Sequence, residues 1–470
     1  MYNSTSKNAD EFIDDREINE TIAYAKENGK NSATVSEILD KAALCRGLSY
    51  REAAVLLACD DAAALARIES IARDIKTKIY GRRIVMFAPL YLSNYCVNEC
   101  RYCPYHHSNH HIARKQLTQD EIRREVIALQ DMGHKRLALE TGEDAANCPI
   151  EYVLESIKTI YGIHHKNGAI RRVNVNIAAT TVQNYTRLRD AGIGTYILFQ
   201  ETYHKSTYEY LHPKGPKHNY AYHTEAMDRA MTGGINDVGI GVLFGLSDCF
   251  YDFIGLLMHA KHLEDAFGVG PHTISVPRIR PADDVDLEEY PNAVNDALFA
   301  KIVAILRLAV PYTGLIISTR ESESSRESVL KLGVSQISGA SCTSVGGYVE
   351  HESENSAQFD VNDTRTLDEI VGWLMKLGYM PSFCTACYRE GRTGDRFMQL
   401  AKSGQIGNVC QANALMTLKE YLEDYAAPET RALGEALIRE ECPLIPNEAV
   451  RAQVLAHLTE LSSGARDFRF

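Results

Sequence analysis

The chain has 470 residues, 45% of them hydrophobic and 24% charged, which is the composition of a globular protein too long for one small core. Its formal net charge of −12 at pH 7 argues against a nucleic-acid partner, because phosphate binding favours a basic face. The first residues lack a basic stretch followed by an apolar one, and no apolar run reaches about 18 residues. We therefore expect a cytoplasmic protein with no membrane partner.

Residues 1–80 are predicted to form an N-terminal helical extension. Ser49 and Glu52 have the spacing of a capping box at the start of a helix. Leu65, Ile68 and Ile71 then recur at helical spacing. No strand-like pattern occurs before about residue 83.

From that point short β-rich runs alternate with longer amphipathic stretches, a pattern that indicates repeated β–α units and a parallel sheet. The pattern predicts an α/β fold, a (β/α)8 TIM-type barrel over residues 81–378, with a doubly wound open sheet as the alternative. Residues 379–470 show no further strand pattern and are predicted to form a C-terminal, mainly helical domain. The predicted strands are Arg83–Leu92, Arg136–Glu140, Arg172–Ala178, Thr195–Gln200, Asp237–Phe244, Thr273–Pro277, Gly314–Thr319 and Ser335–Gly339.

A tight group of three cysteines follows the first predicted strand. Cys96, Cys100 and Cys103 have the spacing C-x3-C-x2-C, and clustered thiols in a reducing compartment indicate metal ligands. Three thiolates can bind three irons of a four-iron cluster, which leaves the fourth iron open to another ligand. The alternative is a zinc site completed by His106 or His107.

This cysteine spacing, with the aromatic residue Tyr102 before the third cysteine, resembles the radical S-adenosylmethionine (SAM) superfamily. The resemblance implies a 4Fe–4S cluster whose open iron binds SAM, with Tyr102 close to the cofactor. The second predicted strand ends in Thr141, Gly142 and Glu143, which resemble the Gly-Gly-Glu turn that binds the SAM amino group in this superfamily. Thr141 stands in place of the first glycine of that turn.

Four further segments resemble the aromatic-amino-acid lyases of the superfamily: residues 200–203, 239–246, 275–281 and 318–321. Gln200 and Glu201 end the fourth predicted strand, where the resemblance places polar side chains facing SAM. The alternative is that they form an ordinary solvated strand end. The same segments are shared by the thiamine-pathway enzyme that makes 2-iminoacetate from tyrosine and by the tyrosine lyases of [FeFe]-hydrogenase maturation.

A second cysteine group distinguishes these two families. Cys384, Cys387 and Cys410 have the spacing C-x2-C-x22-C, which resembles the C-terminal cluster motif of the hydrogenase maturases of the HydG family. The thiamine-pathway enzyme lacks this motif. The resemblance implies an auxiliary 4Fe–4S cluster that could carry an extra iron.

The resemblance implies a lyase that cleaves the Cα–Cβ bond of L-tyrosine to p-cresol and dehydroglycine. Dehydroglycine would then be converted to iron-bound carbon monoxide and cyanide for the hydrogenase active site. Its implied partners are a low-potential electron donor such as ferredoxin or flavodoxin and companion hydrogenase maturases. The alternatives are a 2-iminoacetate synthase and a non-catalytic iron–sulfur scaffold.

Two more residues are expected at the site. Arg320 ends the seventh strand, where barrel enzymes place catalytic side chains, and we predict that it binds the tyrosine carboxylate. The alternative is a structural ion pair with Glu321 or Glu323. His272 precedes the sixth strand and is predicted, at the opposite end of the barrel, to bind iron at the second cysteine group. The alternatives are that it only caps the strand, or that the ligand is one of His259, His262 and Cys442.

Overall fold

The computed structural model describes residues 1–350 and 356–470. Eight parallel strands form a barrel that closes through pairing of β10 with β1, so the prediction of a (β/α)8 barrel is confirmed and the open-sheet alternative is wrong. Each of the eight predicted strands is present, although most are shorter than predicted. They are β1 (Arg83–Ser93), β2 (Arg136–Thr141), β5 (Arg172–Asn176), β6 (Tyr196–Ile197), β7 (Val238–Gly241), β8 (Thr273–Ser275), β9 (Gly314–Ile317) and β10 (Gln336–Ser338).

A ninth strand lies in the segment that was predicted to contain none. β11 (Met380–Ser382) runs parallel to β1 and pairs with its first residues, Arg83–Val85, while β10 pairs with Val85–Phe87. The prediction failed because three residues, one of them a proline, are too few to show a period of two. β1 therefore begins beside β11 and continues beside β10.

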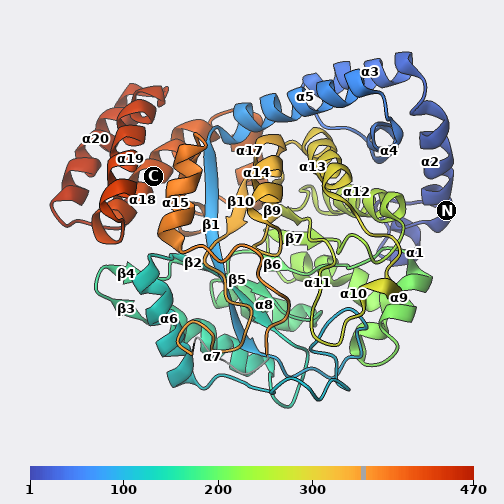
Figure 1. The fold of residues 1–470 in the computed structure, drawn as a ribbon, viewed down its shortest axis with the longest axis horizontal. Coiled ribbons are helices and arrows are strands. Elements are labelled where there is room, and N and C mark those ends of the chain that lie inside the picture. Colours follow the sequence, from blue (N-terminus) through green and yellow to red (C-terminus); the bar gives the residue numbers. More distant parts are fainter. Residues whose placement is uncertain (351–355) are drawn as a thin grey trace.

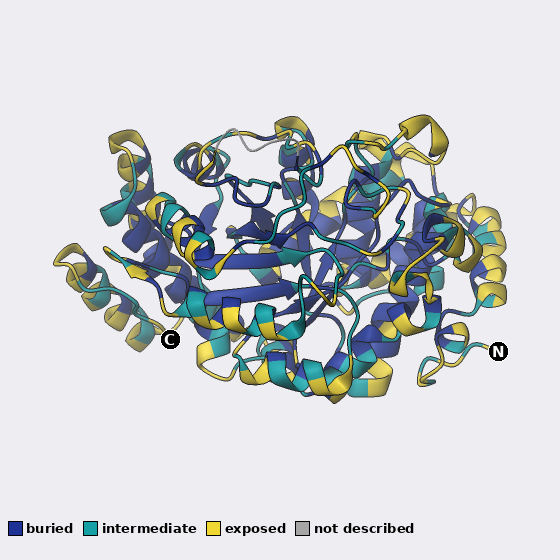
Figure 2. Cartoon of the chain, turned by 90° about the horizontal axis from the view of Figure 1, so that it is seen from below, coloured by how far each residue is buried: buried dark blue, intermediate teal, exposed yellow. Residues whose placement is uncertain are grey.

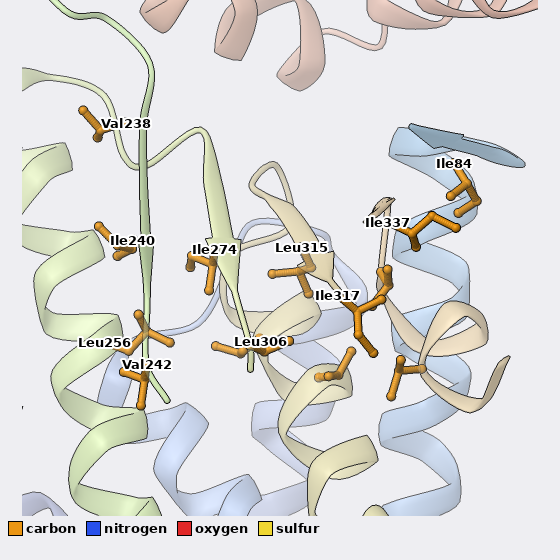
Figure 3. Close-up of a cluster of buried hydrophobic side chains, with 14 of the residues drawn as sticks. Ile84, Val238, Ile240, Val242, Leu256, Ile274, Leu306, Leu315, Ile317 and Ile337 are labelled. Atoms are coloured by element: carbon orange, nitrogen blue, oxygen red, sulfur yellow. The ribbon is translucent and has the colours of Figure 1, made fainter. Parts of the chain in front are cut away.

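The strands alternate between a face that packs on helices and a face that lines the barrel interior. Figure 3 shows the outward side chains of neighbouring strands packed on helices. All are almost fully buried, and burying one such side chain stabilises the fold by about 2 kcal/mol. They include Ile240 of β7, Ile274 of β8, Leu315 and Ile317 of β9, and Ile337 of β10, with Leu256 and Leu306 on the helices.

Helices surround the barrel (Figure 1). The first of them, α6, begins at a capping box that Thr118 and Glu121 form reciprocally. A short hairpin of β3 (His164–His165) and β4 (Gly168–Ala169) interrupts the series. The helices are α6 (Gln119–Met132), α7 (Ile150–Tyr161), α8 (Val182–Asp190), α9 (Lys205–Leu211), α10 (Tyr220–Thr224), α11 (Ala226–Thr232), α12 (Cys249–Phe267), α13 (Asp296–Ala309), α14 (Glu323–Leu332) and α15 (Leu367–Lys376).

Helical segments flank the barrel on two sides, the first helices of the chain at the upper right of Figure 1 and the last at the left. Their outer faces are exposed and their inner faces buried (Figure 2). The predicted capping box at Ser49 and Glu52 is present at the start of α4. The first set is α1 (Ala9–Phe12), α2 (Asp15–Asn28), α3 (Ser32–Ala43), α4 (Tyr50–Ala58) and α5 (Ala62–Tyr80); the second is α16 (Ala386–Arg389), α17 (Gly394–Lys402), α18 (Ile406–Asp424), α19 (Pro428–Glu441) and α20 (Glu448–Ser462).

None of the helices in residues 1–350 and 356–470 has both the length and the apolar character needed to cross a membrane.

Candidate functional site

The first cysteine group lies in the loop that leaves β1, at the carboxyl ends of the strands. Cys96, Cys100 and Cys103 all line one cavity, here called the loop cavity. Burial, and then the charge of neighbouring Cys96, raises the pKa of Cys103 to about 11. Burial likewise raises the pKa of Cys100. These thiols therefore need a nearby positive charge, such as iron, to become the thiolates that bind metal.

The turn after β2 is joined to this cysteine loop by hydrogen bonds. The Gly142 amide donates to the Ser93 carbonyl at 3.0 Å, and the Val97 amide donates to the Glu143 carbonyl at 2.8 Å. The Asn98 side chain donates to Glu143 Oε2 at 2.7 Å and lies 3.7 Å from the Cys96 sulfur. Burial raises the pKa of Glu143. The predicted SAM-binding turn and the cysteines thus form one unit.

Gly142 is required here by close approach of the backbone. A Cβ at this position would lie 2.2 Å from the Tyr95 carbonyl oxygen and 3.1 Å from the Cys96 Cβ. Because neither neighbour is a flexible side-chain end, Gly142→Ala should displace the cysteine loop and lower SAM cleavage by about tenfold or more. The measurement is 5′-deoxyadenosine formation together with iron content.

The control is Gly372→Ala on α15, where the nearest atom to a new Cβ is Thr430 Oγ1 at 3.5 Å. This control should retain both activity and iron. Wild-type activity and iron content in Gly142→Ala would show that the turn does not constrain the cysteine loop.

Of the other residues predicted to contact SAM, three line the loop cavity and one, Gln200, does not. Tyr102, Thr141 and Glu201 line the loop cavity with Gly142 and Glu143. Glu201 has a φ of +69°, a backbone conformation that is strained for a non-glycine residue, and its carboxylate forms an ion pair with Lys217 at 2.9 Å. Its side chain is therefore held in the cavity at an energetic cost.

Gln200, which is predicted to face SAM, lies outside the loop cavity. Its buried side chain donates to Thr224 Oγ1 on α10 at 2.9 Å. This hydrogen bond joins the end of the fourth barrel strand to α10, so Gln200 contributes to the packing around the site.

Arg320 lies where two cavities meet. It lines the loop cavity and a second cavity deeper inside the strands, here called the barrel cavity, and its guanidinium carbon is 3.8 Å from the centroid of the Phe359 ring. Burial lowers the pKa of Arg320. The ion pairs considered as alternatives are not formed, because Glu321 pairs with Arg278 and Arg280, and Glu323 pairs with Arg365. Arg320 is therefore available to a ligand.

The second cysteine group lines a cavity at the opposite end of the barrel, here called the base cavity. Cys384, Cys387 and Cys410 lie in its wall together with His272, whose Nδ1 is 3.5 Å from Asp237 Oδ1. Hydrogen bonding to Cys410, and then to Arg392, lowers the pKa of Cys387 to about 6 against the opposing effect of burial.

None of the alternative iron ligands lines the base cavity. His259 bonds to the Tyr203 hydroxyl, and His262 bonds to Asp228 and to the Ser4 carbonyl. Cys442 is buried at the end of α19. Only His272 of the four candidates is placed beside the three cysteines.

Three arginines, Arg83, Arg136 and Arg172, also line the base cavity. Their hydrogen bonds go to neutral acceptors, for example the Gln411 amide, the Cys384 carbonyl and Thr195 Oγ1. Across residues 1–350 and 356–470 none of the three has a carboxylate partner within 4.0 Å. Buried cations without an anion are costly, so the base cavity is suited to negatively charged occupants such as a thiolate-bound cluster and a small anion.

The two cysteine groups lie at opposite ends of β1. Arg83, its first residue, lines the base cavity, whereas Cys96 follows its last residue, Ser93. A strand of 11 residues spans about 36 Å at ~3.3 Å per residue, so the two cysteine groups are far apart. A broad groove of about 860 Å³ lies next to the base cavity and shares Arg172 and Tyr388 with it.

The donor set fits iron–sulfur clusters better than a single ion. In the described part of the chain, no three His, Cys, Asp or Glu side chains are grouped so that they could hold one metal ion. A four-iron cluster attaches each thiolate to a different iron, so its ligands are spread more widely than those of a zinc ion. The alternative of a zinc site at Cys96, Cys100 and Cys103 is therefore not supported.

Several residues of these cavities were not predicted from the sequence. Asn98, in the cysteine loop, contacts the turn, and Lys217, in a short 3-10 helix, contacts Glu201; no sequence signal identifies either residue. The three base arginines did carry a signal, because each begins a predicted strand, and strand starts share one end of a barrel.

Comparison with known proteins agrees with this geometry. Residues 90–257 match the family model of the radical SAM superfamily, whose members use a 4Fe–4S cluster and SAM, and residues 275–380 match the Biotin and Thiamin Synthesis associated domain. The chain is 31% identical over 359 residues to the 2-iminoacetate synthase of Salmonella typhimurium, covering 75% of this chain and 90% of that protein.

Two solved structures are similar over nearly the whole chain. A crystal structure of HydG, described as a maturase of the [FeFe]-hydrogenase, is 55% identical with a TM-score of 0.95, covering 98% of this chain and all of that one. HydG from Carboxydothermus hydrogenoformans is 38% identical with a TM-score of 0.82, covering 96% and 99%. This chain is therefore a radical SAM enzyme that belongs to the HydG family of [FeFe]-hydrogenase maturases.

Proposed function

We propose that this enzyme is a SAM-dependent lyase that cleaves the Cα–Cβ bond of L-tyrosine to p-cresol and dehydroglycine. Dehydroglycine is then converted to carbon monoxide and cyanide, bound to iron, for assembly of the [FeFe]-hydrogenase active site. Its partners in this role are a low-potential electron donor such as ferredoxin or flavodoxin, and companion hydrogenase maturases.

The observation that carries the proposal is the arrangement of three cavities inside one barrel. The loop cavity holds the SAM-type cysteine loop and adjoins the barrel cavity, which is lined by aromatic rings and by Arg320. The base cavity holds the second cysteine group at the other end. A two-stage reaction that passes a small intermediate from one end to the other suits this architecture. The aromatic lining comes from Phe87, Tyr91, Phe199 and Phe359.

At the loop cavity, Cys96, Cys100 and Cys103 would hold a 4Fe–4S cluster, which would supply the electron for reductive cleavage of SAM. Gly142 and Glu143 hold the SAM amino group against the cysteine loop. Arg320 binds the carboxylate of tyrosine through its planar fork of donors. The aromatic residues enclose the ring and exclude water and stray hydrogen donors from the radical.

At the base cavity, Cys384, Cys387 and Cys410 would hold an auxiliary cluster, which supplies iron to bind the products. His272 would offer its Nε2 to an additional iron, with Asp237 Oδ1 lying 3.5 Å from its Nδ1 on the other side of the ring. Arg83, Arg136 and Arg172 compensate the negative charge of the thiolates and of a small anionic intermediate.

The direct test is an anaerobic assay of iron-reconstituted enzyme with SAM, dithionite and tyrosine. We expect p-cresol, 5′-deoxyadenosine and carbon monoxide to form together, and none of them without SAM. SAM cleavage without p-cresol would exclude tyrosine as the substrate. SAM cleavage and p-cresol without carbon monoxide would instead favour 2-iminoacetate synthesis, the activity of the Salmonella typhimurium relative.

Arg320→Lys tests the binding of the tyrosine carboxylate. Lysine retains the charge but loses the bidentate geometry, so tyrosine affinity should fall by about tenfold while SAM affinity is unchanged. Equilibrium dialysis of both ligands measures this. The control is Arg229→Lys, because Arg229 stacks at the same 3.8 Å on an aromatic ring, that of Tyr222, outside all three cavities. Unchanged tyrosine affinity in Arg320→Lys would remove Arg320 from the site.

A further inference from the structure

A carboxyl group, Glu140, shares the junction of the loop and barrel cavities with Arg320. Glu140 is the second-last residue of β2 and, like Arg320, lines both cavities. The two side chains do not neutralise each other, because no ion pair within 4.0 Å joins them, Glu321 being the acid that the nearby arginines use. The junction therefore presents one acidic and one basic group to whatever occupies it.

Glu140 is held in place from the neighbouring strand. Asn176 ends β5, which pairs with β2 so that Glu140 lies directly opposite Asn176. The Asn176 side-chain amide donates to Glu140 Oε2 at 2.7 Å and lines the same two cavities. One carboxyl oxygen is thus fixed by Asn176. The other oxygen makes no hydrogen bond within the described residues, and the side chain that carries it lines both cavities.

The electrostatic setting suits a cationic ligand group. Burial raises the pKa of Glu140 to about 8, and the hydrogen bond from Asn176 and the charge of Arg320 only partly oppose this. Tyr91 on β1 and Tyr105 in the cysteine loop are close enough for the charge of Glu140 to contribute to the raised pKa of each hydroxyl. An ammonium group beside Glu140 would stabilise the carboxylate and recover the free energy lost on burial.

We infer that Glu140, held by Asn176, binds the α-amino group of the amino-acid substrate while Arg320 binds its carboxylate. This inference rests on the proposed function and specifies how the substrate is oriented. A carboxyl and a guanidinium that face one junction without pairing match the two charges of a zwitterionic amino acid. The amino group is thereby placed on the side of the loop cavity, where SAM binds, and the aromatic ring extends into the barrel cavity.

The test uses the holoenzyme with SAM bound and without reductant, so that binding is measured without turnover. The probes are tyrosine, 3-(4-hydroxyphenyl)propionate, which lacks the amino group, and tyramine, which lacks the carboxylate. Glu140→Gln should weaken tyrosine and tyramine by about tenfold, because the amide cannot pair with an ammonium, and should leave the propionate unchanged. Arg320→Lys should weaken tyrosine and the propionate but not tyramine.

A matched control is Glu125→Gln on α6. Glu125 is also a buried carboxyl with a pKa raised by burial, but it accepts the amides of Tyr348 and Val349, both at 3.0 Å, and lines neither cavity. The Glu125→Gln enzyme should bind all three probes with the affinity of the wild type. If Glu140→Gln does not retain its clusters, Asn176→Ala replaces it, and the same pattern across the three probes is expected.

Equal tyrosine affinity in wild type and Glu140→Gln would overturn the inference. An equal loss for all three probes, or a loss confined to SAM, would also overturn it and would assign Glu140 to the fold or to the cofactor. Failure of the proposed function is a separate outcome, because the wild-type holoenzyme would then neither bind tyrosine nor form p-cresol.

Discussion

Replacing Cys96, Cys100 or Cys103 with alanine is expected to abolish SAM cleavage. Each thiolate would hold a separate iron, and all three lie in one loop that is bonded to the SAM-binding turn. Changes outside a metal's ligand set already cost 10–100-fold in activity, so losing a ligand should lower 5′-deoxyadenosine formation by about 100-fold or more.

The measurement is 5′-deoxyadenosine formed under dithionite, with iron content determined on the same samples. Cys249→Ala is the control, since Cys249 is a half-buried thiol at the start of α12, outside the three cavities. It should retain wild-type activity. Robust SAM cleavage by any of the three loop variants would contradict the assignment of this cysteine group.

Cys387→Ala and Cys410→Ala should separate the two halves of the reaction. p-Cresol should still form, because the loop and barrel cavities lie at the other end of the strands. Carbon monoxide and cyanide should fall by about 100-fold, since an auxiliary cluster would lose a ligand. The yields of all three products from one reaction provide the comparison.

Cys442→Ala serves as the control for this second pair, because Cys442 is buried in the same C-terminal segment but away from the base cavity. Its products should match those of the wild type in kind and ratio. Loss of p-cresol together with carbon monoxide in Cys387→Ala or Cys410→Ala, with SAM cleavage also lost, would mean that the two sites do not act separately.

The barrel could be predicted because its signal is repeated and long. Each of the eight strands is a short run of β-favouring residues, and the capping boxes at Ser49 and Thr118 indicate helix starts by a local hydrogen-bond pattern. β11 was not predicted, because its three residues form a strand only through pairing with Arg83–Val85, which lie about 300 positions earlier. Pairing of that kind leaves no periodic trace in the sequence.

Among the cavity residues, those with a local sequence signal could also be predicted, whereas those placed by long-range contacts could not. Cysteine spacing identified candidate ligands, because the chemistry of the motif is contained in a few neighbouring positions. The hydrogen bond of Gln200 to Thr224 could not be predicted, because Thr224 comes from a helix whose position the sequence does not reveal. Lys217 reaches Glu201 only after the chain has turned back through α9. Glu140 and Asn176 are ordinary strand residues until pairing of β2 with β5 places them opposite each other.

The shared strand β1 has a consequence for how the enzyme itself is built. The first cysteine group occupies eight consecutive positions, so its ligands are neighbours as soon as that stretch has been synthesised. The surroundings of the second group exist only when the end of the chain returns to the start of β1, where Arg83 bonds to Gln411 across 328 positions. Closing so long a loop requires a nearly complete fold. Cofactor loading should therefore be ordered in time, with the base cavity the last to become competent, so that an incomplete chain is never able to carry out the second stage.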